Sequence, residues 1–422
     1  MLVGLAANLA RKEVGNRLRS AITGDASDAK TLAVRIEQAK LLVEDFGRLK
    51  GAVMKAGQLL SMDAGDLVPP EVVAVLEKLQ ANAEIVPFAT MRQVLLDEIG
   101  PEKLARLENI EEVPAASASI GQVYRAYVDG NAVAVKVQYP GVAESIDSDL
   151  VVLRKLGHSL ITLSGRKMKL DAFTEELGRV LHFEADYERE RAYMDRFARA
   201  LAADARYCVP QSCPELSTNR VLTMSWEEGV PFAAYVKTPH PRATREAIGH
   251  ALLDLFFTEL FDLGVVQTDP NFANFLVREN GPCIVLLDFG ASVEFDPEFR
   301  SAYVELVRSI ASGDAKRIVD SAIAFGVIDP REKVETLSLF TDLLIHAFVP
   351  FREDRQPFAF SDKSYLDEAR VQGERFTREL LYSAPPKQLV FLHRKLGGLF
   401  VMLKQLDVAL DLRPYADRLM GA

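Results

Sequence analysis

Two carboxylates and an amide stand at an informative spacing in the second half of the chain. In QTDPNFANFL (267–276), Asp269 comes five residues before Asn274, and Asp288 follows in LLDFGAS. Apolar residues surround all three, which indicates polar groups held on a rigid scaffold. Carboxylate and amide oxygens are ligands of hard cations such as Mg²⁺. The pattern therefore predicts a site that binds a positive partner.

The same residue types occur in this order in protein kinases. There a catalytic-loop Asp precedes an Asn by five residues, and the Asp of a DFG motif follows. In that arrangement Asp269 would orient or deprotonate a nucleophile, while Asn274 and Asp288 would hold Mg²⁺ against nucleotide phosphates. A DFG alone is a weak signal, but the ordered set predicts phosphate chemistry.

A lysine in a run of valines is the second candidate. Lys136, in VAVKVQ, follows the small-residue stretch AASASIGQV (115–123) by the length of one hairpin. Small residues let a backbone approach a ligand closely, and backbone N–H groups bind phosphate oxygens. The alternative is a solvated lysine on the outer face of a strand. The predicted nucleotide-binding residues are Ala115, Ala116, Ser117, Ala118, Ser119, Ile120, Gly121, Gln122, Val123, Lys136 and Met224.

The acidic stretch FEADYERE supplies candidate partners for Lys136. If the stretch is one helix, Asp186 and Glu190 are four residues apart and share a face, whereas Glu184 points elsewhere. The functional hypothesis is that one glutamate pairs with Lys136 and holds it toward the phosphates. The alternative is a solvated acidic helix surface.

The elements that must position these residues change along the chain. Residues 1–110 show helical spacing, 111–226 contain a strand–turn–strand pattern around Asp129–Gly130–Asn131 followed by a helical stretch, and 227–422 are mainly helical. We predict a strand pair near FLVRENGPCIVLLDFG within the last segment. This order indicates an α+β protein with a helical preface, a small strand-rich lobe and a larger helical lobe.

Composition excludes several classes of protein. The net charge of −10 argues against a nucleic-acid binder, and three cysteines are too few for a disulfide framework. Cys208 and Cys213 lack CxxC spacing and are interpreted as buried or incidental thiols. No apolar run approaches the ~18–20 residues of a membrane-spanning helix. The basic N-terminal stretch (1–20) fits either an interfacial amphipathic helix or a helix packed on the protein.

With these motifs the chain resembles the UbiB/ADCK/AarF family of atypical, protein-kinase-like proteins. The resemblance extends from about residue 45 to about residue 400 and includes LKGAVMKAGQLLS, with a KxGQ motif, and the late FLHRKLGG (391–398). It implies a two-lobed kinase-like fold with an alanine-rich nucleotide loop and an N-terminal helical extension packed over the active site. The matching family-motif residues are Lys55, Gly57, Gln58, Glu184 and Asp186.

The resemblance also implies roles, cofactors and partners. Asp269, Lys136 and Glu190 are the expected catalytic residues, with Glu184 as the alternative partner of Lys136. ATP or ADP and Mg²⁺ are the expected cofactors. We expect a Mg²⁺-dependent ATPase or small-molecule or lipid kinase supporting ubiquinone or other isoprenoid-lipid metabolism. The alternative is a nucleotide-binding pseudokinase scaffold for lipids or biosynthetic enzymes. We expect a cytoplasmic protein with no transmembrane segment, in peripheral contact with the inner membrane at most.

Overall fold

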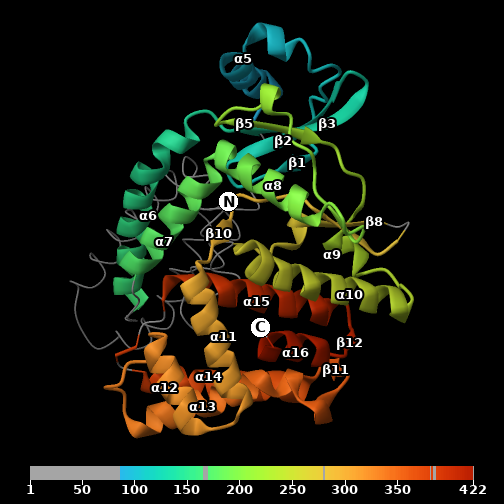
Figure 1. Ribbon diagram of the computed structural model, residues 1–422. Coiled ribbons are helices and arrows are strands. Elements are labelled where there is room, and N and C mark those ends of the chain that lie inside the picture. The colour runs from blue at the N-terminus through green and yellow to red at the C-terminus, as the bar shows by residue number, and fades with distance from the viewer. Residues whose placement is uncertain (1–85, 165–169, 279–280, 381, 384–385, 422) are drawn as a thin grey trace, which may run out of the picture. The chain divides into compact units, whose positions relative to one another are not determined.

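The computed structural model describes residues 86–164, 170–278, 281–380, 382–383 and 386–421 (Figure 1). Backbone contacts divide the chain into two compact units. Unit 1 holds the described residues up to Glu188 together with Cys213–Thr223, and unit 2 holds Arg189–Ser212 and the residues from Met224 onward. These units divide the chain differently from the three predicted segments, whose boundaries at 110 and 226 stay predictions.

A four-stranded sheet with a helix on one face forms the core of unit 1 (Figure 1). Its strands run in the order β1 (Ala116–Ser117), β2 (Gly121–Val128), β3 (Asn131–Gln138) and β5 (Val221–Ser225). The helix α5 (Phe88–Leu104) presents Met91, Leu95 and Ile99, spaced four apart, to this sheet. The sheet residues that meet them are Tyr124, Ala126, Val133, Val135 and Val137.

The predicted hairpin is confirmed. Strands β2 and β3 pair antiparallel with Val128 opposite Asn131, which leaves a two-residue loop. Both loop residues have positive φ, 51° at Asp129 and 78° at Gly130. Asp-Gly tolerates this conformation, and its twist matches that of the flanking strands. The register places Lys136 opposite Val123, so the loop and the lysine lie on neighbouring strands.

The predicted helical stretch after the hairpin is confirmed as helices α6 (Val142–Ser164), α7 (Leu170–Glu184) and α8 (Tyr187–Leu201). Helices α6 and α7 pack against each other. A Cβ at Gly178 would lie 2.7 Å from a methyl group of Leu150, so the glycine allows the close approach. The single-helix assumption for FEADYERE is wrong: α7 ends at Glu184, and Asp186 lies in the break before α8.

Unit 2 contains small sheets and many helices. One sheet runs in the order β4 (Tyr207–Cys208), β9 (Cys283–Leu286), β8 (Phe275–Arg278) and β6 (Val230–Pro231). Two further pairs are β7 (Val265–Gln267) with β10 (Ser292–Glu294), and β11 (Phe358–Ala359) with β12 (Ala409–Leu410). The strand pair β8–β9 was predicted, whereas the two- and three-residue strands were not, because such short elements carry no periodicity.

Helices supply most of unit 2, as predicted for the residues after 227. In chain order they are α9 (Phe232–Tyr235), α10 (Arg242–Phe257), α11 (Pro297–Ala311), α12 (Ala315–Ala324), α13 (Val334–Phe348), α14 (Lys363–Glu379), α15 (Lys387–Gln405) and α16 (Arg413–Gly421). A π-helical turn, η2 (Thr258–Leu263), extends α10. The 3₁₀ turns are η1 (Pro214–Leu216) in unit 1, and η3 (Phe272–Asn274), η4 (Val349–Phe351) and η5 (Glu353–Arg355) in unit 2.

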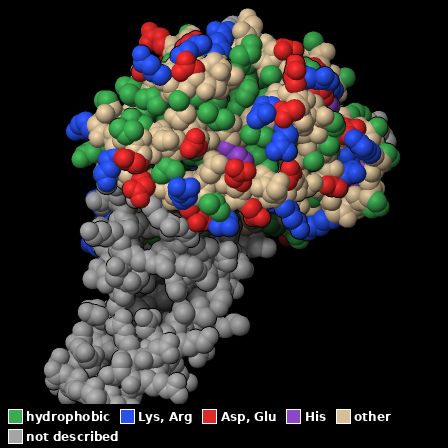
Figure 2. Space-filling model, turned by 90° about the horizontal axis from the view of Figure 1, so that it is seen from below, with side chains coloured by type: hydrophobic (Ala, Val, Ile, Leu, Met, Phe, Trp, Pro, Cys, Tyr) green, Lys and Arg blue, Asp and Glu red, His purple; other side chains and the backbone are tan. Residues whose placement is uncertain are grey.

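One stretch in the described part of the chain, Val334–Phe351, is long and apolar enough to cross a membrane by length and composition. This stretch limits the expectation that no apolar run of the chain approaches the length of a membrane-spanning helix. Part of the stretch packs in the core of unit 2, because Phe340 of α13 lies in a cluster with Leu306 of α11, Ala322 of α12 and Ile328. Figure 2 shows acidic and basic side chains interspersed with apolar ones on the visible face of unit 2.

The core of unit 1 predicts the effect of one truncation. Leu95 is fully buried between α5 and the sheet, so Leu95→Ala should lower the free energy of unfolding of unit 1 by about 2–5 kcal/mol. Amide hydrogen exchange of α5 measures this change. Val113→Ala is the control, because Val113 is 76% exposed and should change exchange little. Equal protection of α5 in both variants would contradict the assigned core.

Candidate functional site

Backbone hydrogen bonds join the segment that carries Asp269 to the segment that carries Asp288. The amide of Thr268 donates to the carbonyl of Ala291 (3.0 Å), where β7 pairs with β10. The amide of Leu287 donates to the carbonyl of Asn274 (3.0 Å), where β8 pairs with β9. The two strand pairs therefore bring Asp269, Asn274 and Asp288 together. Every residue in these two hydrogen bonds is one of the three or lies within three positions of one of them.

The loop between these pairs has a defined conformation. We call residues 267–274 the Asp269 loop. The side chain of Asn271 accepts from the amide of Ala273 (3.0 Å), and Asn274 Nδ2 donates to the carbonyl of Asp269 (3.3 Å). The Asn274 side chain thus reaches back to the backbone of Asp269. Asp269 is 8% exposed.

The first turns of α8 lie against the DFG segment. A Cβ added at Gly290 would be 3.5 Å from Asp288 Oδ1 and 3.6 Å from Glu190 Oε2, so both carboxylates lie beside this glycine. Glu190 is 1% exposed, which excludes the solvated-surface alternative for it. The Arg189 guanidinium donates to the carbonyl of Gly290 (2.8 Å) and to that of Ser292. Helix α8 therefore fixes the backbone on either side of Ala291.

The DFG phenylalanine is part of the same contact. Phe289 is 1% exposed and packs against Phe197 of α8, with ring centroids 5.1 Å apart. Asp288 Oδ1 accepts a hydrogen bond from the amide of Gly290 (3.0 Å). The apolar anchor and this local bond hold the Asp288 carboxylate in one orientation.

In unit 1 the predicted nucleotide loop is a tight hairpin. The amide of Ala118 donates to the carbonyl of Gly121 (2.8 Å), and the amide of Ala115 donates to that of Val123 (2.8 Å). Gly121 is required there, because a Cβ would lie 2.3 Å from the carbonyl oxygen of Val137 on the paired strand. The glycine therefore allows the loop to lie directly on β3.

Lys136 is a buried lysine. It is 7% exposed, and its Nζ lies 5.0 Å from the ring centroid of Tyr187. This burial excludes the alternative of a solvated strand lysine. A buried ammonium requires compensation, and the aromatic face supplies a part of it.

The remaining predicted nucleotide-binding residues differ in exposure. The side chain of Ile120 is buried, and that of Gln122 is buried and hydrogen-bonded to the Tyr124 hydroxyl (2.7 Å), so any contribution of either to a ligand would come from its backbone. Ala115, Ala116 and Ser117 are exposed, whereas Ala118, Ser119 and Val123 are half-buried. Met224, in β5, belongs to unit 2 and is 5% exposed.

The family-motif glutamate lies at the nucleotide loop. Ser119 Oγ donates a hydrogen bond to Glu184 Oε2, which ties the end of α7 to the loop. Asp186, two residues on, is half-buried. Lys55, Gly57 and Gln58 lie outside the described residues, as does most of the predicted helical extension.

The residues of unit 2 fit a magnesium ion. Asp288 and Asn274 offer a carboxylate and an amide oxygen, and Mg²⁺ is commonly held by one or two such ligands together with waters and phosphates. The described residues contain no group of three or more His, Cys, Asp or Glu arranged to hold a metal. The chemistry of the donors therefore favours a metal bound jointly with nucleotide.

Behind these ligands lies a small cavity of about 10 Å³, enough for roughly one water molecule. Glu259, Gln267, Asn274 and Asp288 contribute to its walls. Glu259 is 1% exposed; burial raises the pKa of its carboxyl group, and the ammonium of Lys395 opposes that shift. The buried Glu259–Lys395 pair thus lies beside a cavity that the candidate metal ligands also line.

The cysteines are not part of this arrangement. Cys208, Cys213 and Cys283 are free and half-buried, as expected of incidental thiols. Burial, followed by the Glu227 carboxylate, raises the pKa of Cys208 to about 12. A thiol with that pKa is protonated at neutral pH and is a poor nucleophile.

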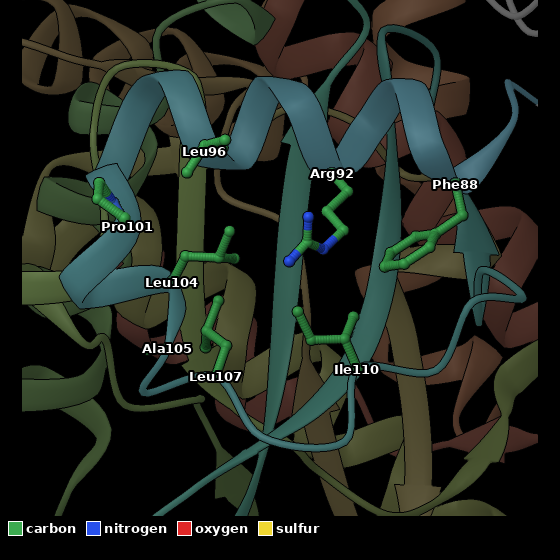
Figure 3. A pocket seen from close by; sticks show the side chains of 8 residues that line it. All are labelled: Phe88, Arg92, Leu96, Pro101, Leu104, Ala105, Leu107 and Ile110. Carbon is green, nitrogen blue, oxygen red and sulfur yellow. The ribbon is translucent and has the colours of Figure 1, made fainter.

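A larger pocket, of about 430 Å³, lies in unit 1 between α5 and the segment that follows it (Figure 3). Its lining residues include none of the predicted site residues. They are Phe88, Arg92, Leu96, Pro101, Leu104, Ala105, Leu107 and Ile110.

Sequence reasoning missed several residues that support the site. Arg189 stands next to Glu190 in a stretch interpreted only for its acids, and its alternation with glutamates was the available signal. Arg394 lies in FLHRKLGG, a stretch that resembles the family but whose sequence predicts no role for this arginine. Both act on backbone carbonyls far away in sequence, so no local pattern marks them.

Comparison with known proteins identifies similar chains. The family described as "ABC1 atypical kinase-like domain" matches residues 78–322. The atypical kinase COQ8B, mitochondrial, of Rattus norvegicus is 35% identical over 385 residues, which cover 89% of this chain and 70% of the relative. The atypical kinase COQ8, mitochondrial, of Schizosaccharomyces pombe is 31% identical, with 96% and 66% covered.

A third relative and a solved structure are also similar to this chain. The atypical kinase coq-8, mitochondrial, of Caenorhabditis elegans is 33% identical over 88% of this chain and 49% of its own length. The chain thus spans between about half and about 70% of the length of these relatives. The complex of Rv3197 with erythromycin from Mycobacterium tuberculosis has a TM-score of 0.62 and 26% identity, covering 94% of this chain and 98% of that one.

The contacts of Arg189 predict a stability effect. Arg189→Met removes the charged donor to two partly buried carbonyls and should lower the free energy of unfolding of unit 2 by about 2 kcal/mol. Trp226, the single tryptophan, lies in unit 2, so its fluorescence during denaturant unfolding reports the change.

The matched control is Arg191→Met. Arg191 forms a local pair with Asp195 (3.3 Å) and should matter by less than about 0.5 kcal/mol. Equal unfolding midpoints for the two variants would contradict the role of Arg189.

Proposed function

Because the chain belongs to the ABC1 family of atypical kinase-like proteins, we propose that it binds ATP with Mg²⁺ and transfers the terminal phosphoryl group to water or to a small-molecule acceptor. Family membership confirms the resemblance seen in the sequence and the kinase-like α+β fold.

One observation carries the proposal more than any other. Two separate strand pairs bring Asp269, Asn274 and Asp288 into one part of unit 2. Asp269 is buried, and Asn274 and Asp288 are half-buried. Withdrawing polar groups from water is costly, so a stable fold alone gives no reason to gather these three side chains here. Phosphoryl transfer, in contrast, requires metal ligands and a group that orients the acceptor.

Each residue has a proposed task. When bound, Mg²⁺ would neutralise the charge that develops on the phosphates. Asp288 and Asn274 would supply oxygen ligands for it, and the Asp269 carboxylate would orient the acceptor hydroxyl or water and accept its proton.

Lys136 would contact the phosphates, and the hairpin loop 115–123 would cover them with its backbone N–H groups. The burial of Lys136 and of Glu190 supports their assignment, since each buried charge requires a counter-charge. Their pairing stays a prediction.

We further propose a role in ubiquinone or related isoprenoid-lipid metabolism. The support is the resemblance of the motifs together with the similarity to the COQ8 atypical kinases, which are named as mitochondrial proteins. Quinone-biosynthesis proteins or isoprenoid lipids are the partners proposed on this ground. The expected cytoplasmic location and the peripheral membrane contact through residues 1–20 stay predictions.

The first test concerns the metal ligand. Asp288→Asn should abolish the Mg²⁺-dependent stabilisation by ATP, because the amide cannot replace an anionic metal ligand. In the native protein, ligand at 100 times its dissociation constant should stabilise by about 2.7 kcal/mol, which a thermal-shift titration with and without Mg²⁺ detects. Asp320→Asn, at an exposed position, controls for the lost charge. An unchanged Mg²⁺-nucleotide affinity in Asp288→Asn would remove the metal assignment.

The second test separates binding from turnover. Asp269→Asn should keep nucleotide affinity but lower phosphate release at least about 100-fold, because general-base contributions are typically that large. Phosphate release is measured at saturating MgATP with protein of confirmed nucleotide binding. Full turnover in this variant would show that Asp269 is not the catalytic carboxylate. Binding without turnover in the native protein would favour the scaffold alternative.

A further inference from the structure

A short segment of α15 contacts the backbone on both sides of Asp269. The segment is residues 394–398, part of FLHRKLGG, and we call it the loop support. It lies about 125 residues after the Asp269 loop in the chain. It contacts Thr268 and Pro270 directly and Gln267 through one intermediate side chain.

The first contact is a hydrogen bond from Arg394. Its Nε donates to the carbonyl of Thr268 (2.8 Å), and the side chain is 8% exposed. The amide and the hydroxyl of Thr268 both donate to the carbonyl of Ala291 (3.0 and 2.8 Å). The residue before Asp269 is therefore held from two sides, by the DFG segment and by α15.

The second contact runs through a buried ion pair. Lys395 Nζ lies 2.9 Å from Glu259 Oε2 and 3.1 Å from Oε1, with the side chains 6% and 1% exposed. Glu259 belongs to the π-helical turn η2, a type of element that is frequent at functional sites. The backbone of Gln267 also acts on this carboxylate, because it opposes the rise in the pKa of Glu259 that burial causes. The pair thus connects α15 with a residue two positions before Asp269.

The third contact depends on a missing side chain. A Cβ at Gly398 would lie 1.9 Å from Cβ and 2.3 Å from Cγ of Pro270. The proline ring therefore occupies the space that any other residue at 398 would fill. The neighbouring Gly397 is exposed, and a Cβ there would have no atom within 4 Å.

We propose that the loop support is a positioning element for Asp269. Arg394, the Lys395–Glu259 pair and Gly398 fix the backbone at 267, 268 and 270, so the residue between them has little freedom of its own. The consequence for catalysis rests on the proposed phosphoryl transfer, whereas the consequence for the loop itself does not. Arg394 touches neither metal nor nucleotide in this assignment, so it is a positioning residue.

The first experiment measures the loop without nucleotide. Amide hydrogen exchange is followed by mass spectrometry on the full chain, in the peptide that spans residues 265–276. Arg394→Gln and Gly398→Ala should each speed its exchange about tenfold or more, as expected from losing a buried charged hydrogen bond or displacing Pro270. Gly397→Ala makes the same change of residue type one position away and should leave exchange as in the native protein.

The second experiment separates positioning from a general structural role. If the native protein turns over MgATP, Arg394→Gln should lower kcat about tenfold or more while nucleotide affinity changes less than about twofold, because misplacement affects the reacting group alone. Arg394→Lys keeps a charged donor and should recover part of the loss. Both variants must keep the native amide exchange rates of α11–α13, measured by the same method.

Each outcome decides the proposal. Unchanged exchange of the 265–276 peptide in both Arg394→Gln and Gly398→Ala would overturn it. Faster exchange throughout unit 2 would also overturn the proposal, as would an equal increase in exchange of the 265–276 peptide in Gly397→Ala. Either result would mean that the segment contributes only ordinary core packing. Faster exchange confined to the Asp269 loop, in a protein without detectable turnover, would confirm the positioning role of the loop support. That result would count only against the proposed function.

Discussion

The hydrogen bond between the amide of Thr268 and the carbonyl of Ala291 is the contact on which the candidate site depends. It joins the end of β7 to the start of β10 and so fixes the distance between the Asp269 loop and the DFG segment. Helix α8 reinforces the same place, because Arg189 bonds the carbonyls on either side of Ala291. Packing of the Phe289 ring on Phe197 then further restricts the conformation of the DFG segment.

This arrangement explains why such short strands recur around the site. Strands β7 and β10 have three residues each and would not be stable alone. They persist because α8 and α15 hold their ends with charged side chains on backbone carbonyls. Asp269, Asn274 and Asp288 therefore lie just beyond strand ends, where the backbone is no longer in a strand but is still held by hydrogen bonds.

Much of the fold and of the candidate site could be predicted from the sequence, and the reason is local. The Asp129–Gly130 turn, the alternating valines around Lys136 and the helical periodicity after 142 each depend on neighbours in the chain. The Asp–Asn–DFG set was found because its spacing is itself a motif. The break between Glu184 and Asp186 was missed, since the helical pattern continues across it. No local pattern predicts a role for Arg394, Lys395 and Gly398, because their partners are more than 120 residues away.

The buried Glu259–Lys395 pair has a consequence for how the protein responds to its medium. Salt weakens attraction between exposed charges, such as Arg242 and Glu246, because mobile ions gather around them. Ions cannot reach a pair whose side chains are 1% and 6% exposed. The geometry behind Asp269 is therefore insulated from ionic strength, even in a protein whose outer surface carries charges of both signs.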